Sequence, residues 1–314
     1  MTHDAHLLTL AGTFLLVLLT LGLWFAYVLG VRSQRRRRKA WPCRRLISFS
    51  LGCGLLVLAL SPPMVEWGHA DLRGHMMQHL LLAMFAPIAL MLGAPGTLLL
   101  RCVPVATARR LTDLAATAPL RCLSHPVTAL LLDIGALYVL YLTPLYQLSF
   151  SQPLLHVWLH LHFVLAGYLF SWSIAGPDPA PHRPGMWLRL VVLFIAIAGH
   201  AVLGKLMYAY GFPRDAGHGL AQIEAAAQLM YYGGDLAELL LALVFFATWY
   251  RRRATSAAFG WQTANRRTSR VPGPAVRCCR GAQRLTRRRS RRRGFPARSM
   301  RGAALRPHRR SLPR

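Results

Sequence analysis

The sequence has few acidic residues and, outside its C-terminal part, little charge of either sign. Of its 314 residues, 10 are Asp or Glu, 38 are Lys or Arg, and 15% are charged. A soluble globular protein usually carries about 25% charged residues. Residues 251–314 hold 21 Arg and no acid, so the rest of the chain is apolar and weakly charged. These features exclude, as the main interpretation, a soluble enzyme or a protein that only binds nucleic acid.

Motifs of thiol chemistry and of hydrolytic or nucleotide-driven catalysis are also missing. The six cysteines form no C-x-x-C pair, which argues against a thiolate metal site and a disulfide framework. The sequence has no phosphate-binding loop, no dinucleotide-binding glycine pattern, no H-E-x-x-H and no G-x-S-x-G. We therefore expect a protein that is not an enzyme.

The chain does contain long apolar segments. A helix needs about 20 mostly apolar residues to cross ~30 Å of hydrocarbon. Seven segments qualify, at about residues 7–30, 46–65, 75–100, 126–148, 154–175, 186–207 and 227–249. We expect an all-α polytopic membrane protein, with a bundle of seven transmembrane helices in residues 1–250. Because its basic residues follow the first apolar segment, we expect that segment to be a retained span and not a signal peptide.

The basic residues of the loops predict the orientation, because cytoplasmic loops carry an excess of Lys and Arg. With the N-terminus outside, the inner loops 31–45, 101–125 and 176–185 hold 13 basic residues, whereas the outer loops hold only Arg73 and Arg214. This distribution predicts an N-out, C-in protein of the plasma membrane.

The tail, residues 251–314, is rich in Arg and has no periodic apolar pattern. We expect it to be disordered and attracted to anionic lipid. Binding to nucleic acid is the alternative interpretation, although no specific nucleic-acid partner is expected.

Two pairs of histidines recur at the same spacing near the outer ends of two predicted spans. His75 and His79 lie in HMMQH, and His156 and His160 lie in HVWLH. Residues four apart share one face of a helix. His200 lies at a comparable predicted depth in another span.

Imidazole binds copper, zinc, iron and nickel, and soft thioether ligands favour Cu(I). The pattern therefore predicts a copper site formed by the two pairs, with Met76 or His200 as further candidate ligands. The alternative is that these histidines are ordinary polar residues at the membrane–water boundary, and that the methionines fill the core.

Carboxylates lie inside two predicted spans: Asp133 in the fourth, and Asp235 and Glu238 in the seventh. Acids inside a membrane are functional candidates by default. They are expected to orient a ligand imidazole or to relay protons. A fixed polar contact between helices remains the alternative.

Six sequence segments occur in the order typical of one known family. They are HMMQHLLLAMFAPIALMLGAP (75–95), SHPVTALLL (124–132), TPLY (143–146), HVWLHLHFVLAGYLFSW (156–172), GPDP (176–179) and AQLMYYGGDLAELLLALVFF (227–246). Residues from about 45 to 250 resemble the CtaG family of bacterial cytochrome c oxidase assembly factors.

The resemblance implies a multi-helix inner-membrane protein that helps to build a haem–copper oxidase, and copper delivery is the usual proposal for such factors. Its implied partners are oxidase subunits or a copper chaperone, within the lipid bilayer. The polar positions that match are His75, Gln78, His79, His156, His160, Asp235 and Glu238. The family pattern commonly has an acid just before the second histidine of the fifth span, where this chain has Leu159.

The leading hypothesis is an assembly factor that holds Cu(I) near the outer face and passes it on by ligand exchange. Three alternatives remain open. They are a transporter of copper or another cation, a b-type haem redox protein with axial histidines from the third and fifth spans, and a structural scaffold with interfacial histidines.

Overall fold

The computed structural model describes residues 3–180, 182–214 and 217–268, and all regular structure in these ranges is helical. Two segments, η1 and η2, are π-helical. The helices are α1 (His3–Arg36), α2 (Cys43–Ala59), α3 (Pro62–Ala70), α4 (Leu72–His79), η1 (Leu80–Phe85), α5 (Ala86–Leu92), α6 (Pro95–Cys102), α7 (Val105–Ala115), α8 (Ala118–Leu123), α9 (Pro126–Leu130), η2 (Leu131–Gly135), α10 (Ala136–Leu142), α11 (Leu145–Ser151), α12 (Pro153–Ala175), α13 (Met186–Tyr210) and α14 (Leu220–Thr268). No strand occurs in the described residues, so the all-α expectation is confirmed.

Several helices are long and apolar enough to cross a membrane, so the chain is a membrane protein. Five stretches qualify singly: Leu10–Arg36, Leu72–Leu92, Pro153–Ala175, Met186–Tyr210 and Leu220–Arg251. Two bent pairs, α2 with α3 and α9–α10 with α11, raise the number to as many as seven if each pair is one span. The predicted seven spans are the upper end of this range, and the N-out orientation stays a prediction.

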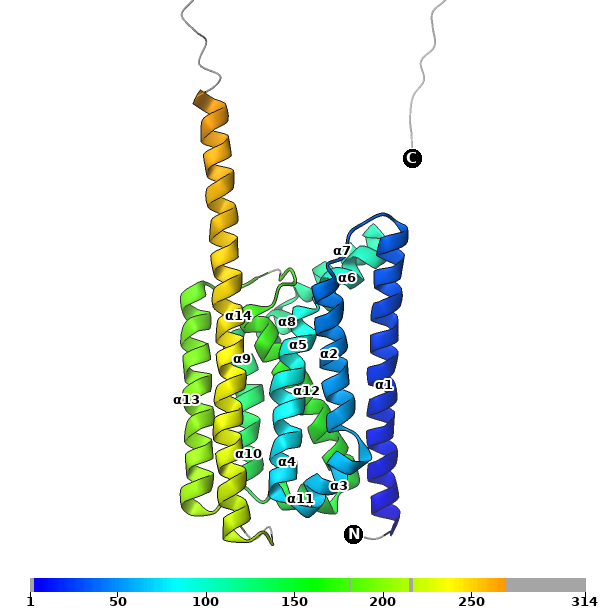
Figure 1. Ribbon diagram of the computed structural model, residues 1–314, viewed down its shortest axis with the longest axis vertical. Helices are drawn as coiled ribbons and strands as arrows, with labels where there is room; N and C mark the ends of the chain where they lie inside the picture. The colour runs from blue at the N-terminus through cyan, green and yellow to red at the C-terminus, as the bar shows by residue number, and fades with distance from the viewer. Residues whose placement is uncertain (1–2, 181, 215–216, 269–314) are drawn as a thin grey trace, which may run out of the picture. The chain divides into compact units, whose positions relative to one another are not determined.

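Proline breaks two of the predicted spans. The chain bends by 52° between α2 and α3 and by 82° between α10 and α11. In both cases the residue before a proline, Ser61 or Thr143, has an extended backbone, because proline disfavours the helical conformation of its predecessor. The predicted spans 46–65 and 126–148 are therefore bent, and α3 and α11 lie at the end of the bundle where α1 begins (Figure 1).

The predicted span 75–100 ends early, at Leu92, where the chain turns through Ala94 in the left-handed region (φ 52°) before α6. A carboxylate from the α12–α13 loop anchors the new helix. Asp178 accepts hydrogen bonds from the backbone N–H of Gly96 (3.1 Å) and of Thr97 (2.7 Å). Asp178 is the acid of the GPDP segment, which therefore joins the α12–α13 loop to the first turn of α6.

The π-helical segments pack closely on their neighbours. A Cβ atom at Gly167 of α12 would overlap the carbonyl oxygen of Ala83 in η1, so this helix pair requires glycine at that position. In η2, the carbonyl oxygen of Leu132 lies 3.0 Å from His162 Nε2 of α12. The ring of His162 therefore contacts the backbone of η2 directly. Both π segments are thus fixed by α12.

The last helix is longer than predicted. The tail was expected to be disordered from residue 251, but α14 continues to Thr268. Residues 251–268 contain Arg, Ala and Gln, which favour helix, and no proline before Pro272. The chain divides into two units, Met1–Trp261 and Gln262–Arg314. The predicted disorder of residues 269–314 lies outside the described residues.

Replacing Gly167 by Ala tests the close contact of α12 with η1. We expect Gly167→Ala to lower the free energy of unfolding by about 1–3 kcal/mol, because backbone must move to admit the methyl group. Gly54→Ala is the matched control, since no atom lies within 4 Å of a Cβ placed there. Thermal unfolding of both variants in detergent provides the comparison. Equal midpoints would contradict the described packing.

The two hydrogen bonds from the start of α6 to Asp178, called the Asp178 clamp below, are tested in the same way. We expect Asp178→Ala to destabilise the protein by about 1–3 kcal/mol, because it leaves partly buried N–H groups of Gly96 and Thr97 without acceptors. Asp113→Ala removes an exposed carboxylate of α7 and should change stability by less than about 0.5 kcal/mol. A loss of stability in Asp113→Ala as large as that in Asp178→Ala would refute the specific role of the clamp.

Candidate functional site

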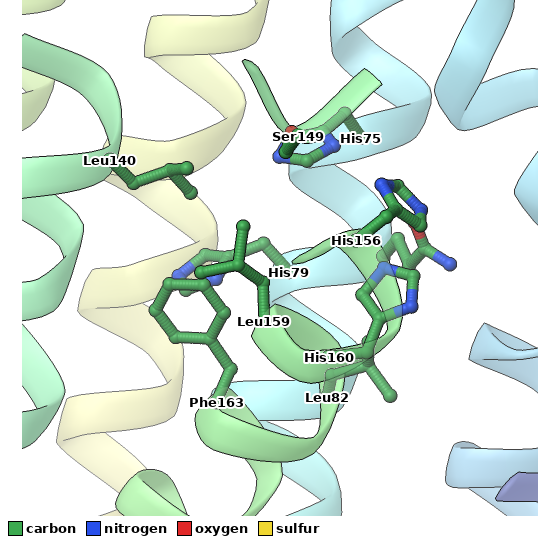
Figure 2. Close-up of a pocket in the computed structure, with 10 residues that line it drawn as sticks. His75, His79, Leu82, Leu140, Ser149, His156, Leu159, His160 and Phe163 are labelled. Carbon is green, nitrogen blue, oxygen red and sulfur yellow. The ribbon is translucent and has the colours of Figure 1, made fainter. Parts of the chain in front are cut away.

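The two predicted histidine pairs line one small cavity near the end of the bundle where α4 and α12 begin. Figure 2 shows the arrangement. The cavity is lined by His75, Gln78, His79, Leu82, Leu140, Ser149, His156, Leu159, His160 and Phe163. Its volume is about 20 Å³, which is room for about one water molecule. The site is therefore of a size for a single small ion or molecule.

Local contacts fix α4, which carries the first pair. Asp71 caps the helix by accepting the backbone N–H of Arg73 at 2.9 Å, and it also binds the Arg73 guanidinium. These hydrogen bonds lower the pKa of the Asp71 carboxyl. At the other end of α4, Gln78 Nε2 donates to the carbonyl of Ala59 at 2.8 Å. Gln78 thus ties the histidine helix to the end of α2.

The second pair lies on the first turns of α12, which begins with Pro153, a residue suited to the first turn of a helix. The rings of His156 and His160 are in edge contact, with centroids 4.4 Å apart. The ring of His69, from α3, lies 5.0 Å from that of His156. His156 and His160 therefore form the closest imidazole pair of the site, and Figure 2 shows them on one side of the cavity.

Aromatic rings surround the other two imidazoles. The centroid of His75 lies 5.0 Å from that of Tyr146, and the centroid of His79 lies 5.3 Å from that of Phe163. Both contacts are edge-on, the arrangement that aromatic pairs prefer. The site therefore has apolar, aromatic walls and few polar groups besides the imidazoles.

All four histidines are buried, with 5–9% of their surface exposed. Five of their ring nitrogens are fully buried and have no hydrogen-bond partner: Nδ1 of His75, both nitrogens of His79, Nε2 of His156 and Nδ1 of His160. A buried polar atom without a partner costs about 1–3 kcal/mol. Such atoms gathered at one cavity make it a candidate site for a ligand of imidazole nitrogen.

The side chains do not already form a complete metal site. In residues 3–180, 182–214 and 217–268, no three His, Cys, Asp or Glu side chains lie close enough together to hold a metal ion. The four imidazoles thus share a cavity, but binding one ion through three or more of them would require the rings to move.

Other predicted site residues do not line the cavity. Met76 is fully buried in the apolar core of the bundle. His200 of α13 is also fully buried and lacks partners on both ring nitrogens. Its ring packs directly against Gly234 of α14, where a Cβ would overlap it. Neither predicted additional ligand lines the cavity.

The three intramembrane carboxylates lie near one another, because Glu238 is within electrostatic reach of Asp235 and Asp133. Glu238 is 3% exposed, and its Oε2 atom has no hydrogen-bond partner. It lies on α14 one helical turn after Gly234, and helical side chains point toward the preceding turn. Asp133 of η2 is 6% exposed. The next residue, Ile134, packs against α13: its Cγ2 atom lies 3.2 Å from the position that a Cβ atom would take at Gly199. Asp235 is only partly buried. None of the three acids lines the cavity.

The structure adds two residues that the sequence analysis did not name as site candidates. Ser149 lines the cavity because the sharp bend before α11 folds this helix toward the histidines. Tyr146, also on α11, packs on His75, and its hydroxyl lies 3.2 Å from His218 Nε2. The TPLY segment marked this region, but its role depends on a tertiary contact.

Comparison with known proteins gives a consistent family. Uncharacterized proteins of Mycobacterium bovis and Mycobacterium tuberculosis are each 37% identical over 185 residues, 57% of this chain and 28% of the relative. One from Mycobacterium leprae is 36% identical over 189 residues, 58% of this chain and 29% of the relative. This chain thus spans less than a third of the length of these relatives. No solved structure matches significantly.

A family model matches residues 25–252, which includes all the helices that line the cavity. The match begins within α1, earlier than the predicted start near residue 45. The chain belongs to the cytochrome c oxidase caa3 assembly factor family, Caa3_CtaG.

Proposed function

We propose that this protein assists the assembly of cytochrome c oxidase by binding Cu(I) in the histidine cavity and passing it to an oxidase subunit or a copper chaperone. The observation that carries the proposal is the set of buried imidazole nitrogens without partners around one ion-sized cavity. Neutral imidazole is a good copper ligand. Family membership supports the oxidase as the destination.

The charge of the cavity supports a monovalent ion. Among the described lining residues, there is no carboxylate. Leu159, at the position where the family pattern commonly has an acid, faces this cavity. The cost of burying an ion without counter-charge rises steeply with its charge. A carboxylate-free cavity therefore favours Cu(I) over divalent metals.

The same neutrality suits delivery. Cu(I) accepts low coordination numbers, so the close pair of His156 and His160 can hold it before His75 and His79 adjust. Without a carboxylate to retain the charge, an incoming ligand from a partner exchanges with an imidazole more readily. The site would lie near the outer face of the plasma membrane, as the distribution of loop charges predicts.

The remaining polar groups take supporting roles in this proposal. Gln78 holds the helix that carries His75 and His79 through its bond to Ala59. Glu238 and Asp133, two buried carboxyl groups within electrostatic reach of each other, would relay protons through the bundle, and Asp235 would take part from the same helix as Glu238. A haem held by one histidine of each pair is disfavoured, because the cavity that both pairs line, of about 20 Å³, is far below the roughly 300–1,000 Å³ of pockets for larger ligands.

Copper binding by the purified full-length protein tests the ligand assignment. We expect the double variant His79→Ala/His160→Ala to bind Cu(I) at least about tenfold more weakly, equivalent to ~1.4 kcal/mol, because one imidazole is lost from each helix. Competition with a colorimetric Cu(I) chelator under reducing conditions measures the affinity.

The control for this test is His125→Ala/His182→Ala, which removes two histidines at other places in the chain. It should bind copper as the wild type does. Equal affinity in all three proteins would sink the proposed site, and any copper held by the tail would then account for binding.

Oxidase activity in cells tests the delivery role separately. In a strain that lacks this protein, we expect cytochrome c oxidase activity to fall and to recover at least partly when copper is added. The His79→Ala/His160→Ala variant should show the same copper-dependent defect. Full assembly with that variant in copper-poor medium would point instead to a scaffold role that needs no metal.

A further inference from the structure

A second and larger pocket lies at the opposite end of α12 from the histidine cavity. It is formed by α8, the start of α9 and the segment that leads into α13, and its volume is about 680 Å³. The helix α12 separates the two sites, with His156 in its first turn and Ala175 at its end. At about 1.5 Å per residue, they are roughly 30 Å apart along the helix axis.

Four of the described residues that line this pocket carry a guanidinium or an imidazole group, and none of the described lining residues carries a carboxylate. The four are Arg121, His125, His182 and Arg183. Arg121 is exposed, and its guanidinium makes no ion pair or hydrogen bond with the described part of the chain. Two arginines and two imidazoles around one hollow favour an anion.

Hydrogen bonds prearrange two of these groups. His125 Nδ1 accepts the backbone N–H of Val127 at 3.3 Å, which leaves the proton of a neutral ring on Nε2 as a donor. Arg183 donates to the carbonyl oxygens of Gly176 and Asp178. It lies over the ring of Trp172, with its Cζ 5.8 Å from the centroid. The wall of the pocket is therefore held in place before an anion binds.

The surroundings of the pocket match a membrane surface. The adjoining helix α7 has no buried residue, and it exposes both apolar side chains, such as Val105 and Leu114, and the basic Arg109 and Arg110. Trp187, in the first turn of α13, is 75% exposed. Basic amphipathic helices and exposed tryptophans are typical of the lipid headgroup region.

We propose that this pocket binds the phosphate of an anionic phospholipid of the inner leaflet. Arg121 and Arg183 would hold the phosphate oxygens, His125 would donate from Nε2, and His182 would cover the exposed side. The acyl chains would extend into the bilayer beside α9. Arginine suits phosphate because its planar guanidinium can donate two parallel hydrogen bonds. This site does not depend on copper binding in the histidine cavity.

The test uses the full-length protein in nanodiscs that contain phosphatidylglycerol and phosphatidylcholine, with native mass spectrometry to count the lipids that stay bound. We expect the wild type to retain phosphatidylglycerol in preference to phosphatidylcholine. Arg121→Gln should lower the retained phosphatidylglycerol by about tenfold, because one charge-assisted contact to phosphate is lost.

Arg109→Gln is the matched control, because it removes the same charge from neighbouring α7 without altering the pocket, and it should retain lipid as the wild type does. Cys122→Trp, which fills the pocket at unchanged charge, should lose lipid as Arg121→Gln does. Equal retention in Arg109→Gln and Arg121→Gln would overturn the proposal by showing general attraction to basic residues. Binding of soluble glycerol phosphate as tightly as phosphatidylglycerol would overturn it in favour of a site for free phosphate.

Discussion

Buried imidazole nitrogens without partners are the constraint on which the site depends. Water satisfies such atoms on a protein surface, but here aromatic and aliphatic side chains exclude it, apart from about one molecule in a cavity of 20 Å³. The histidines of α4 and α12 therefore carry a cost that a bound cation can offset. Because the surrounding groups are neutral, the same arrangement would bind an ion without retaining it strongly, as the proposed delivery of copper requires.

The rest of the fold keeps these two helices in register. The Asp71 cap and the Gln78 bond fix α4, while Gly167 lets α12 approach the π-helical segment that directly follows His79. The π-helical segment η1 therefore lies directly beside the histidines of the cavity. At the other end, the Asp178 clamp joins the α12–α13 loop to α6. The result is a membrane bundle with the histidine cavity near one end and the basic pocket near the other.

The sequence predicted the helical class, the family and the residues around the cavity, because these depend on local patterns. The spacing of His75 and His79 fixes a shared helix face wherever the helix packs. The sequence could not predict every contact, so His200 was expected to be a further ligand, whereas its ring packs against Gly234 and does not line the cavity. A proline at position 144 is visible in the sequence, but the 82° turn that brings Ser149 to the cavity also depends on packing against α12.

The most direct test of the account is the X-ray absorption spectrum of the full-length protein loaded with Cu(I). The account predicts that nitrogen ligands dominate the first shell of copper and that the multiple scattering typical of imidazole is present. Coordination by sulfur alone, supplied by cysteines or methionines away from the cavity, would contradict it.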